Sequence, residues 1–476
     1  MDEHMPSYKE EELVRDDLIK AGHQVGELAR QWADSHVCVE QTFDFEAMAL
    51  ETAAALQKSD TVCEATFYEG GLVCMVDIFR KVGENRAEII EVKAATKTKP
   101  YHVDDATFQT YVVEKAGYQV DKVWIMHLNP EYRLNGELNL EELFVLEDIS
   151  SKVRKRLSMV ETDIVRLEGM RYQKEEPSVA IGRHCNSPHA CPYQCWCWRE
   201  VPEKSIFNLA GMGRLRGMKH WENGANTYEK TLQQADFGEL RLNDLQRAQI
   251  KAETGKGDTV DKVRLSKFLD DITFPLYFLD FETIQPAVPE FQGTRCYQQI
   301  PTQFSLHWLE TPDGELHHAE YLAPSKGDPR RGVAEALIDA IPTDACVTAY
   351  NMSFEKGRIK EMANAFNDLF ASLMAIHDNI VDLMIPFQKG WAYKEAMGGS
   401  YSIKKVLPAI WPNDPELNYD ALTGVHNGAQ AMEAFAMLKD MEPGPEALVR
   451  QQLLEYCKLD TLAMVKVWQW LKASDA

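Results

Sequence analysis

Asp280 and Glu282 stand two residues apart in the stretch Pro275–Thr283, and their types and spacing could do chemistry. Five of the first seven residues of this stretch are apolar or aromatic, which predicts a strand buried on both faces. Side chains at i and i+2 of a strand share one face, so both carboxylates point the same way. Such a pair suits a hard cation, Mg²⁺ or Mn²⁺. The alternative is a strand end whose acids point into water, because the motif is short.

Two later stretches carry further polar residues of the same kind. Ala345–Asn351 predicts another buried strand, and a helix that carries Glu355 begins directly after it. A long helical pattern runs from about Glu446 to Leu471 and contains Tyr456 and Asp460. These two residues are four apart, so they share one face of that helix.

The order Asp-x-Glu, Asn-x-x-Phe-acid and Tyr-x-x-x-Asp resembles the three motifs of the DEDD exonucleases, the Tyr-bearing branch of the RNase H-like superfamily. The resemblance implies an RNase H-like α/β exonuclease domain over residues 272–476. It also implies that four acids hold two cations and that a tyrosine orients the attacking water, with 3′ to 5′ polarity. The acids would be Asp280, Glu282, Glu355 and Asp460, and the tyrosine Tyr456.

One residue departs from that family pattern, and one further segment agrees with it. The second motif usually ends in Asp, whereas here it ends in Glu355, which keeps the charge but moves it by about one methylene. The segment Gly399–Pro408 is similar to the Ser-Leu-Lys element of the same group.

A second set of acids, with a lysine, lies in the N-terminal part of the chain. Gly71–Arg80 and Ala87–Lys93 predict two strands joined by a turn, which makes a hairpin. Glu91 and Lys93 are two apart on one face, and Asp77 can lie opposite them. Two acids that hold a cation and a lysine that orients water fit phosphodiester hydrolysis. A solvated hairpin with an ordinary Glu–Lys pair is the alternative.

This Asp…Glu-x-Lys pattern resembles the core of the PD-(D/E)XK nucleases of the RecB type. The resemblance implies a restriction-endonuclease-like domain over residues 1–200, with Asp77 and Glu91 as metal ligands and Lys93 as a catalytic residue. It also points to Gln109 on the following helix and to His23 in an early helix, for which an ordinary surface histidine is the alternative. Glu64, from a preceding strand, would add a further carboxylate.

Four cysteines, Cys185, Cys191, Cys195 and Cys197, lie within 13 positions. Thiols this close in a cytosolic chain are usually metal ligands. The spacing of the first, second and fourth resembles that of the iron–sulfur RecB-like nucleases, which include the small CRISPR adaptation nucleases. The resemblance implies a 4Fe–4S cluster, with Cys195 or one of Cys38, Cys63 and Cys74 as the fourth ligand. Tetrahedral Zn²⁺ is the alternative for four cysteines.

The composition narrows the possible classes of protein. The chain of 476 residues has 51 Lys and Arg against 74 Asp and Glu, a net charge of −23, which does not favour coating a long duplex. Residues 204–267 instead carry twelve basic and eight acidic residues, and 201–271 is expected to be a basic helical linker. No run of 18 apolar residues and no signal-peptide pattern is seen, so we expect a cytoplasmic protein without a membrane span.

The whole chain is therefore expected to be an α/β multidomain protein. The order of its parts resembles a bacterial fusion family with no assigned function: a RecB-like nuclease, a cysteine cluster, a linker and an exonuclease domain. It implies a metal-dependent nuclease that acts on DNA with free ends. The alternative is a nucleic-acid-binding scaffold in which one or both nuclease sites are inactive.

Overall fold

The structure is a computed structural model that describes Ser7, Lys9 and residues 16–173, 175–176, 178–412 and 414–475. Its contacts divide the chain into two compact units. The N-terminal unit comprises Leu13–Val179 and Pro286–Gln298, and the C-terminal unit is built mainly from Ala180–Gln285 and Gln299–Ala476. Each unit contains a sheet with helices packed on it, so the expected α/β multidomain class is confirmed.

The N-terminal unit has a six-stranded sheet whose strands follow the order of the chain. β2, β3 and β4 are antiparallel, β4 and β5 are parallel, and β6 is antiparallel to β5. The strands are β1 (Val37–Cys38), β2 (Thr61–Glu69), β3 (Leu72–Gly83), β4 (Arg86–Lys93), β5 (Gln119–Leu128) and β6 (Phe144–Asp148). The helices are α1 (Asp16–Trp32), α2 (Phe45–Ala55), α3 (Pro100–Lys115), α4 (Leu140–Leu143) and α5 (Ser150–Arg171).

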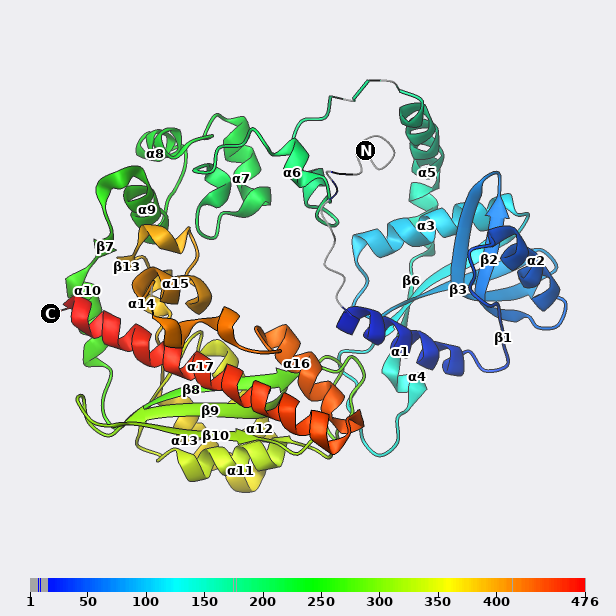
Figure 1. Ribbon diagram of the computed structural model, residues 1–476. Helices are drawn as coiled ribbons and strands as arrows, with labels where there is room; N and C mark the ends of the chain where they lie inside the picture. Colours follow the sequence, from blue (N-terminus) through cyan, green and yellow to red (C-terminus); the bar gives the residue numbers. More distant parts are fainter. Residues whose placement is uncertain are drawn as a thin grey trace. The chain divides into compact units, whose positions relative to one another are not determined.

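The predicted hairpin is β3 and β4, in a register that pairs Ile78 with Ile90 and Phe79 with Ile89. Alternate residues of these strands point to opposite faces. Phe79 and Ile89 pack in the core that α3 covers, and Ile78 and Ile90 pack with α1. Figure 1 shows α3 lying across these strands.

A short segment far away in the sequence completes the N-terminal unit. Ala287, Val288 and Cys296 pack in the same core as Val25 and Ile78. Close to Lys93, the Tyr297 hydroxyl donates a hydrogen bond to the carbonyl oxygen of Ala94 at 2.8 Å. Pro286–Gln298 therefore folds with the N-terminal unit, although it follows a strand of the C-terminal unit.

The C-terminal unit has a five-stranded sheet in the order β10-β9-β8-β11-β12. β9 is antiparallel to both β10 and β8, and β11 is parallel to both β8 and β12. The strands are β8 (Leu276–Ile284), β9 (Ile300–Leu309), β10 (Leu316–Leu322), β11 (Cys346–Ala349) and β12 (Ile380–Asp382). A separate pair joins β7 (Thr259–Val260) to β13 (Ala392–Tyr393).

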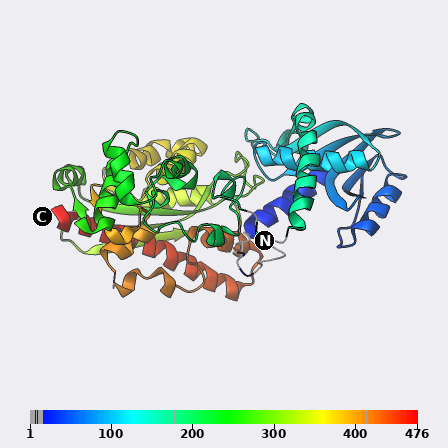
Figure 2. The ribbon, with the colours of Figure 1, turned by 90° about the horizontal axis from the view of Figure 1, so that it is seen from above.

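Helices cover both faces of this sheet. Figure 2 separates the faces, with α17 along one of them and α11, α12 and α13 along the other. The helices are α6 (Gln194–Cys197), α7 (Gly213–Glu222), α8 (Tyr228–Asp236), α9 (Asp244–Lys251), α10 (Lys262–Asp270), α11 (Arg330–Ala340), α12 (Ser353–Ala365), α13 (Phe370–Asp378), α14 (Ile385–Gln388), α15 (Ile403–Ile410), α16 (Gly428–Met437) and α17 (Pro443–Asp475).

The compact units do not follow the expected boundaries at residues 200 and 271. The basic segment packs in the C-terminal unit, where Leu245 of α9 and Leu265 of α10 share a core with Phe387 and Tyr393. Gly390, at φ +70°, lets its turn approach α9 so closely that a Cβ atom would lie 2.5 Å from the Leu245 Cα. The segment is part of a folded unit because its apolar residues find distant partners, which its charge pattern does not reveal.

Within the described part of the chain, no helix is long and apolar enough to cross a membrane.

Candidate functional site

Three carboxylates meet at the centre of the C-terminal sheet. Leu276 and Phe278 of β8 pack in the core with Leu459 of α17, and Asp280 and Glu282 continue the same face of the strand. Asp460 comes from α17 and is 8% exposed. One oxygen from each of Asp280, Glu282 and Asp460 lies within 4.8 Å of the others. Carboxylates gathered in this way suit Mg²⁺ or Mn²⁺.

Glu355 is the fourth acid that the sequence predicted, and it lies in the first turn of α12. It is 2% exposed, and its Oε2 atom finds no hydrogen-bond partner among the described residues. Burial is the largest cause that raises the pKa of Glu355, and the negative charge of Asp280 is the second. A buried carboxylate oxygen without a partner is costly, so Glu355 fits a ligand to a cation bound beside Asp280.

Asp382, which the sequence analysis missed, fixes the chain just before α12. Its carboxylate accepts hydrogen bonds from the backbone amides of Asn351 and Met352, at 2.9 and 3.2 Å. Asn351 has a left-handed backbone, with φ 77°, which asparagine tolerates better than most residues. The position of Glu355 therefore depends on an acid at the end of β12.

Burial raises the pKa values of all four carboxyl groups, and the charges of neighbouring acids raise those of Asp280, Glu282 and Glu355 further. For Asp280 the largest cause is burial, followed by the charge of Asp460. For Glu282 it is again burial, followed by the charges of Asp280 and Asp460. Burial also raises the pKa of Asp460, against hydrogen bonds from Tyr419 and the charge of Lys404. The donor set and its uncompensated charge fit divalent cations.

Lys404 is the cation that the protein itself supplies to this site, from the segment that resembles the Ser-Leu-Lys element. Its Nζ lies 3.3 Å from the Tyr456 hydroxyl and donates to the carbonyl oxygen of His426 at 3.1 Å. The ammonium also lies over the rings of Tyr419 and Tyr456. Lys404 lowers the pKa values of the nearby carboxyl groups and so favours their ionised forms.

Tyr456 lies beside the acids, as the sequence predicted. Burial raises the pKa of its phenol, and the charges of Asp460 and Glu282 raise it further, so Tyr456 keeps its proton. The motifs in the sequence did not predict two further residues beside the acids, Tyr419 and Cys457. Tyr419 donates a hydrogen bond to Asp460 Oδ1 at 2.6 Å, and the Cys457 Sγ lies 3.7 Å from Asp280 Oδ2.

A polar network fastens α17 to β9 and so positions Asp460. The Thr461 hydroxyl is hydrogen-bonded to both Ser305 Oγ and His307 Nδ1, each at 2.8 Å. Two turns earlier in α17, the carbonyl oxygen of Leu453 accepts a hydrogen bond from Gln303 Nε2 of β9 at 2.9 Å. These buried hydrogen bonds favour one register of the helix on the sheet.

The N-terminal unit brings its own predicted residues together. Lys93 Nζ lies 2.6 Å from Glu91 Oε1 and 2.7 Å from Asp105 Oδ2 of α3. Gln109, also on α3, donates to Glu91 Oε2 at 2.7 Å. Asp77 Oδ2 accepts the backbone amide of Val92 at 2.6 Å. Both carboxylates therefore already have protein partners here, whereas the Oε2 atom of Glu355 in the other unit has none among the described residues.

Burial, opposed by the Val92 hydrogen bond, raises the Asp77 pKa to about 6. The charge of Glu64 raises it further; Glu64 stands between the pairs Cys63–Ile78 and Ala65–Val76, opposite Asp77. Arg30 of α1 pairs with Glu64 at 2.9 Å. His23, the other accessory residue expected from α1, is exposed.

The four cysteines of the predicted cluster lie in short turns at the start of the C-terminal unit. Cys185 is buried, Cys191 is half-buried, and Cys195 and Cys197 are exposed on α6. The Cys191 amide donates to the Cys185 carbonyl oxygen at 2.9 Å. In the part of the chain that the structure describes, no three of them bring their sulfur atoms within 4.8 Å. The iron–sulfur cluster and its zinc alternative stay predictions.

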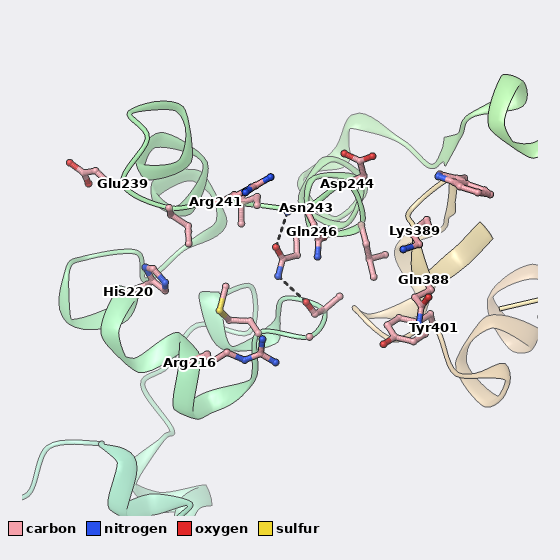
Figure 3. Close-up of a pocket in the computed structure, with 17 residues that line it drawn as sticks. Arg216, His220, Glu239, Arg241, Asn243, Asp244, Gln246, Gln388, Lys389 and Tyr401 are labelled. Atoms are coloured by element: carbon pink, nitrogen blue, oxygen red, sulfur yellow. Dashed lines mark hydrogen bonds between the residues drawn. The ribbon is translucent and has the colours of Figure 1, made fainter. Parts of the chain in front are cut away.

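A pocket of about 1000 Å³ opens in the C-terminal unit between the basic segment and the residues before α15. Figure 3 shows Arg216 and Arg241 on one wall and Lys389 and Tyr401 on the facing wall. None of these three cations has an ion pair among the described residues. Two acids, Glu239 and Asp244, also line the pocket, and Arg264 pairs with Asp244 at 2.7 Å. The pocket is a concentration of free positive charge in a chain of net charge −23.

The known proteins and the domain family that this chain resembles have no assigned activity. Residues 277–402 match a family described as a domain of unknown function, DUF2779. The matched stretch covers about a quarter of the chain and includes Asp280, Glu282 and Glu355, but not Tyr456 or Asp460.

Similar curated proteins come from two Mycoplasma species and from Ureaplasma parvum. An uncharacterized protein of Mycoplasma pneumoniae, the MG366 homolog, is 30% identical over 41% of this chain and 32% of its own length. The uncharacterized protein MG366 of Mycoplasma genitalium is 29% identical over 40% of this chain and 31% of its own. The uncharacterized protein UU173 of Ureaplasma parvum is 30% identical over 41% and 31%. The chain thus spans about a third of the length of these relatives, and no solved structure matches it.

Proposed function

We propose that this protein is a metal-dependent nuclease whose main active site is the carboxylate group of the C-terminal unit. The observation that carries the proposal is the meeting of Asp280, Glu282 and Asp460 within 4.8 Å, together with the buried Glu355, whose Oε2 atom has no hydrogen-bond partner among the described residues. The order of the motifs supports an RNase H-like exonuclease domain of the DEDD type. The position of the acids on the central strand β8, where the sheet changes from antiparallel to parallel pairing, also suits a ligand site.

Divalent cations held by Asp280, Glu282, Glu355 and Asp460 would stabilise the charge of a transferring phosphoryl group and lower the pKa of water. The protein's own residues do the positioning. Tyr456 keeps its proton, so it donates a hydrogen bond that orients water and does not act as a base. Lys404 offsets negative charge at the same place and holds the Tyr456 hydroxyl by its ammonium group.

The proposed substrate is nucleic acid, and DNA with free ends is the form that the resemblance favours. The pocket with Arg216, Arg241 and Lys389 supports this choice, because unpaired cations in an acidic protein attract phosphates. Trp391 and Tyr401 line the same pocket and offer aromatic faces on which bases of a single strand can stack.

A second nuclease site of the PD-(D/E)XK type is proposed in the N-terminal unit. Asp77 and Glu91 would hold the cation, and Lys93 would offset charge on the phosphate. The contact of Gln109 with Glu91 supports the assignment, because the resemblance had singled out this glutamine. Glu91 already contacts Lys93 and Gln109, so a cation at this site would share the Glu91 carboxylate with these two side chains.

Release of labelled nucleotides tests the proposal, with single-stranded DNA, double-stranded DNA and RNA as substrates and Mg²⁺, Mn²⁺ or EDTA present. We expect metal-dependent release that Asp280→Asn reduces by about 10³-fold or more, because several kcal/mol of charge stabilisation is lost. Asp270→Asn, an exposed acid at the end of α10, is the matched control and should act as wild type. Tight binding of nucleic acid without release under every condition would favour the scaffold alternative.

A further inference from the structure

His36, Cys38 and Cys63 form a compact group of possible metal ligands that the nuclease chemistry does not use. One ring nitrogen of His36 and the two sulfur atoms lie within 4.8 Å of one another. Cys38 and Cys63 are directly paired in register on the parallel strands β1 and β2, which explains why the thiols meet. Cys63 is buried, His36 is half-buried and Cys38 is exposed, so the group opens to solvent on one side.

The histidine of this group is oriented by the backbone. Its Nδ1 atom lies 2.5 Å from the carbonyl oxygen of Asp34. A carbonyl oxygen can only accept, so Nδ1 carries the proton and Nε2 keeps a lone pair. Histidines that bind metals commonly donate their other ring N–H to a carbonyl in this way, because the contact fixes the tautomer and the ring. This contact is a second feature, independent of the clustering, that points to a cation.

The donor set selects the kind of metal. Two thiolates and one imidazole are soft and borderline donors, which suit Zn²⁺ and disfavour Mg²⁺ and Ca²⁺. Around tetrahedral zinc, bonds of about 2.0–2.3 Å place the donors about 3.5–3.8 Å apart. The group is within roughly 1 Å of that spacing, a movement that the exposed Cys38 can make.

We propose that His36, Cys38 and Cys63 bind one Zn²⁺ with a solvent molecule in the fourth position. The site would fasten the two-residue edge strand β1 to β2, next to the ion pair of Arg30 and Glu64. It is separate from the cysteine segment 185–197, which belongs to the other unit.

The test measures zinc on the full-length protein after anaerobic purification with a reductant and dialysis against buffer without chelator. The variants Cys38→Ser and His36→Gln change side chains that reach solvent, so they are expected to fold, and thermal melting checks this. Cys74→Ser, a buried thiol of β3 outside the group, is the control. Wild type and Cys74→Ser should each hold one more zinc per chain than the two variants. A Cys185→Ser, Cys191→Ser background should keep the same difference.

Substitution with Co²⁺ gives a second readout. Thiolate-to-cobalt bands should form in wild type and in the Cys185→Ser, Cys191→Ser background, and should weaken in Cys38→Ser. Equal zinc contents in wild type and both variants would overturn the proposal. Loss of iron in place of zinc from Cys38→Ser would also overturn it and assign Cys38 to the iron–sulfur cluster. A Cys38–Cys63 disulfide that forms without metal, with no zinc bound after reduction, would be the third contrary result.

Discussion

Glu355 has one more methylene than the aspartate of the motif that it resembles, yet its carboxylate lies close enough to Asp280 to be affected by the charge of that residue. Its carboxylate is buried in the first turn of α12, and the charge of Asp280 raises its pKa. Asp382 holds the backbone that leads to it. At the scale of single residues, the site gathers acids whose charges repel one another; Lys404 partly offsets that repulsion, and the proposed cations would offset the rest.

Tyr456→Phe tests the role of a single hydroxyl. Its phenol keeps the proton, so the loss removes one oriented hydrogen bond and no charge. We expect nucleotide release to fall on the order of 10²-fold, less than for Asp280→Asn. Single-turnover rates measure the effect. A rate equal to that of wild type would remove Tyr456 from the mechanism.

The raised pKa of Asp77 leads to a prediction of how the free energy of unfolding depends on pH. Its pKa is raised in the folded protein from 3.8 to about 6, so folding favours the protonated form. This contribution is complete below about pH 4 and is lost as the pH rises through about 6. The difference between the two pKa values corresponds to on the order of 3 kcal/mol.

Urea unfolding of the N-terminal unit in EDTA, at several pH values, checks this expectation. Wild type should lose stability relative to Asp77→Asn between about pH 4 and 6. Asp60→Asn, an exposed acid before β2, should follow wild type. Added Mn²⁺ should restore stability to wild type mainly at the higher pH. Parallel curves for wild type and Asp77→Asn would refute the raised pKa.

At the scale of elements, the segment expected to be a linker is packed as part of a unit. Its buried Gln249 donates to the Tyr228 hydroxyl, and Glu253 accepts from both Tyr228 and Tyr393. The Tyr393 hydroxyl in turn accepts the Gly399 amide, close to the segment that carries Lys404. Buried hydrogen bonds therefore hold the basic segment to the residues that precede α15.

Two glycine substitutions test this packing. Gly390→Ala and Gly398→Ala both force alanine into a left-handed backbone, at φ +70° and +55°, which costs about 1–2 kcal/mol. A Cβ at residue 398 meets nothing within 4 Å, whereas at residue 390 it meets the Leu245 backbone. We expect Gly390→Ala to destabilise the C-terminal unit by at least about 2 kcal/mol more, measured by urea unfolding. Equal losses would mean that α9 is not packed on this turn.

The cysteine segment is the element whose chemistry is tested most simply. Anaerobic purification should give a brown protein that absorbs broadly near roughly 400 nm and contains iron. Cys191→Ser should remove the colour, whereas Cys346→Ser, a thiol in β11, should keep it. A colourless protein that holds zinc at this segment would favour the structural zinc alternative.

At the scale of the whole molecule, the chain carries two proposed nuclease sites in two compact units. Each site is complete within its unit: Asp77, Glu91 and Lys93 in one, Asp280, Glu282 and Asp460 in the other. The chain passes between the units more than once, because Pro286–Gln298 folds with the N-terminal unit.

The two activities should therefore be separable. Lys93→Ala should leave end-dependent digestion unchanged, and Asp280→Ala should leave any endonuclease activity unchanged. Linear and circular DNA substrates distinguish the two, with circular dichroism as the check on folding. Loss of every activity in either folded variant would contradict two independent sites.

The sequence by itself determined the strands and helices that carry the acids. Alternating and continuous apolar patterns predicted β3, β4, β8, β11 and α17 because burial of one or both faces is a local property of the pattern. Spacing predicted that Asp280 and Glu282 share a face and that Tyr456 and Asp460 share another.

Only the tertiary structure decided which distant residues complete each site. Tyr419 contacts Asp460, and Asp382 holds the backbone that leads to Glu355, although no motif marks either residue; Arg30 contacts Glu64 from α1. The sequence pattern likewise did not predict how residues 201–271 and Pro286–Gln298 pack into their units. Hydrogen bonds and apolar contacts between segments far apart in sequence depend on shape complementarity, which leaves no period or spacing in the chain to read.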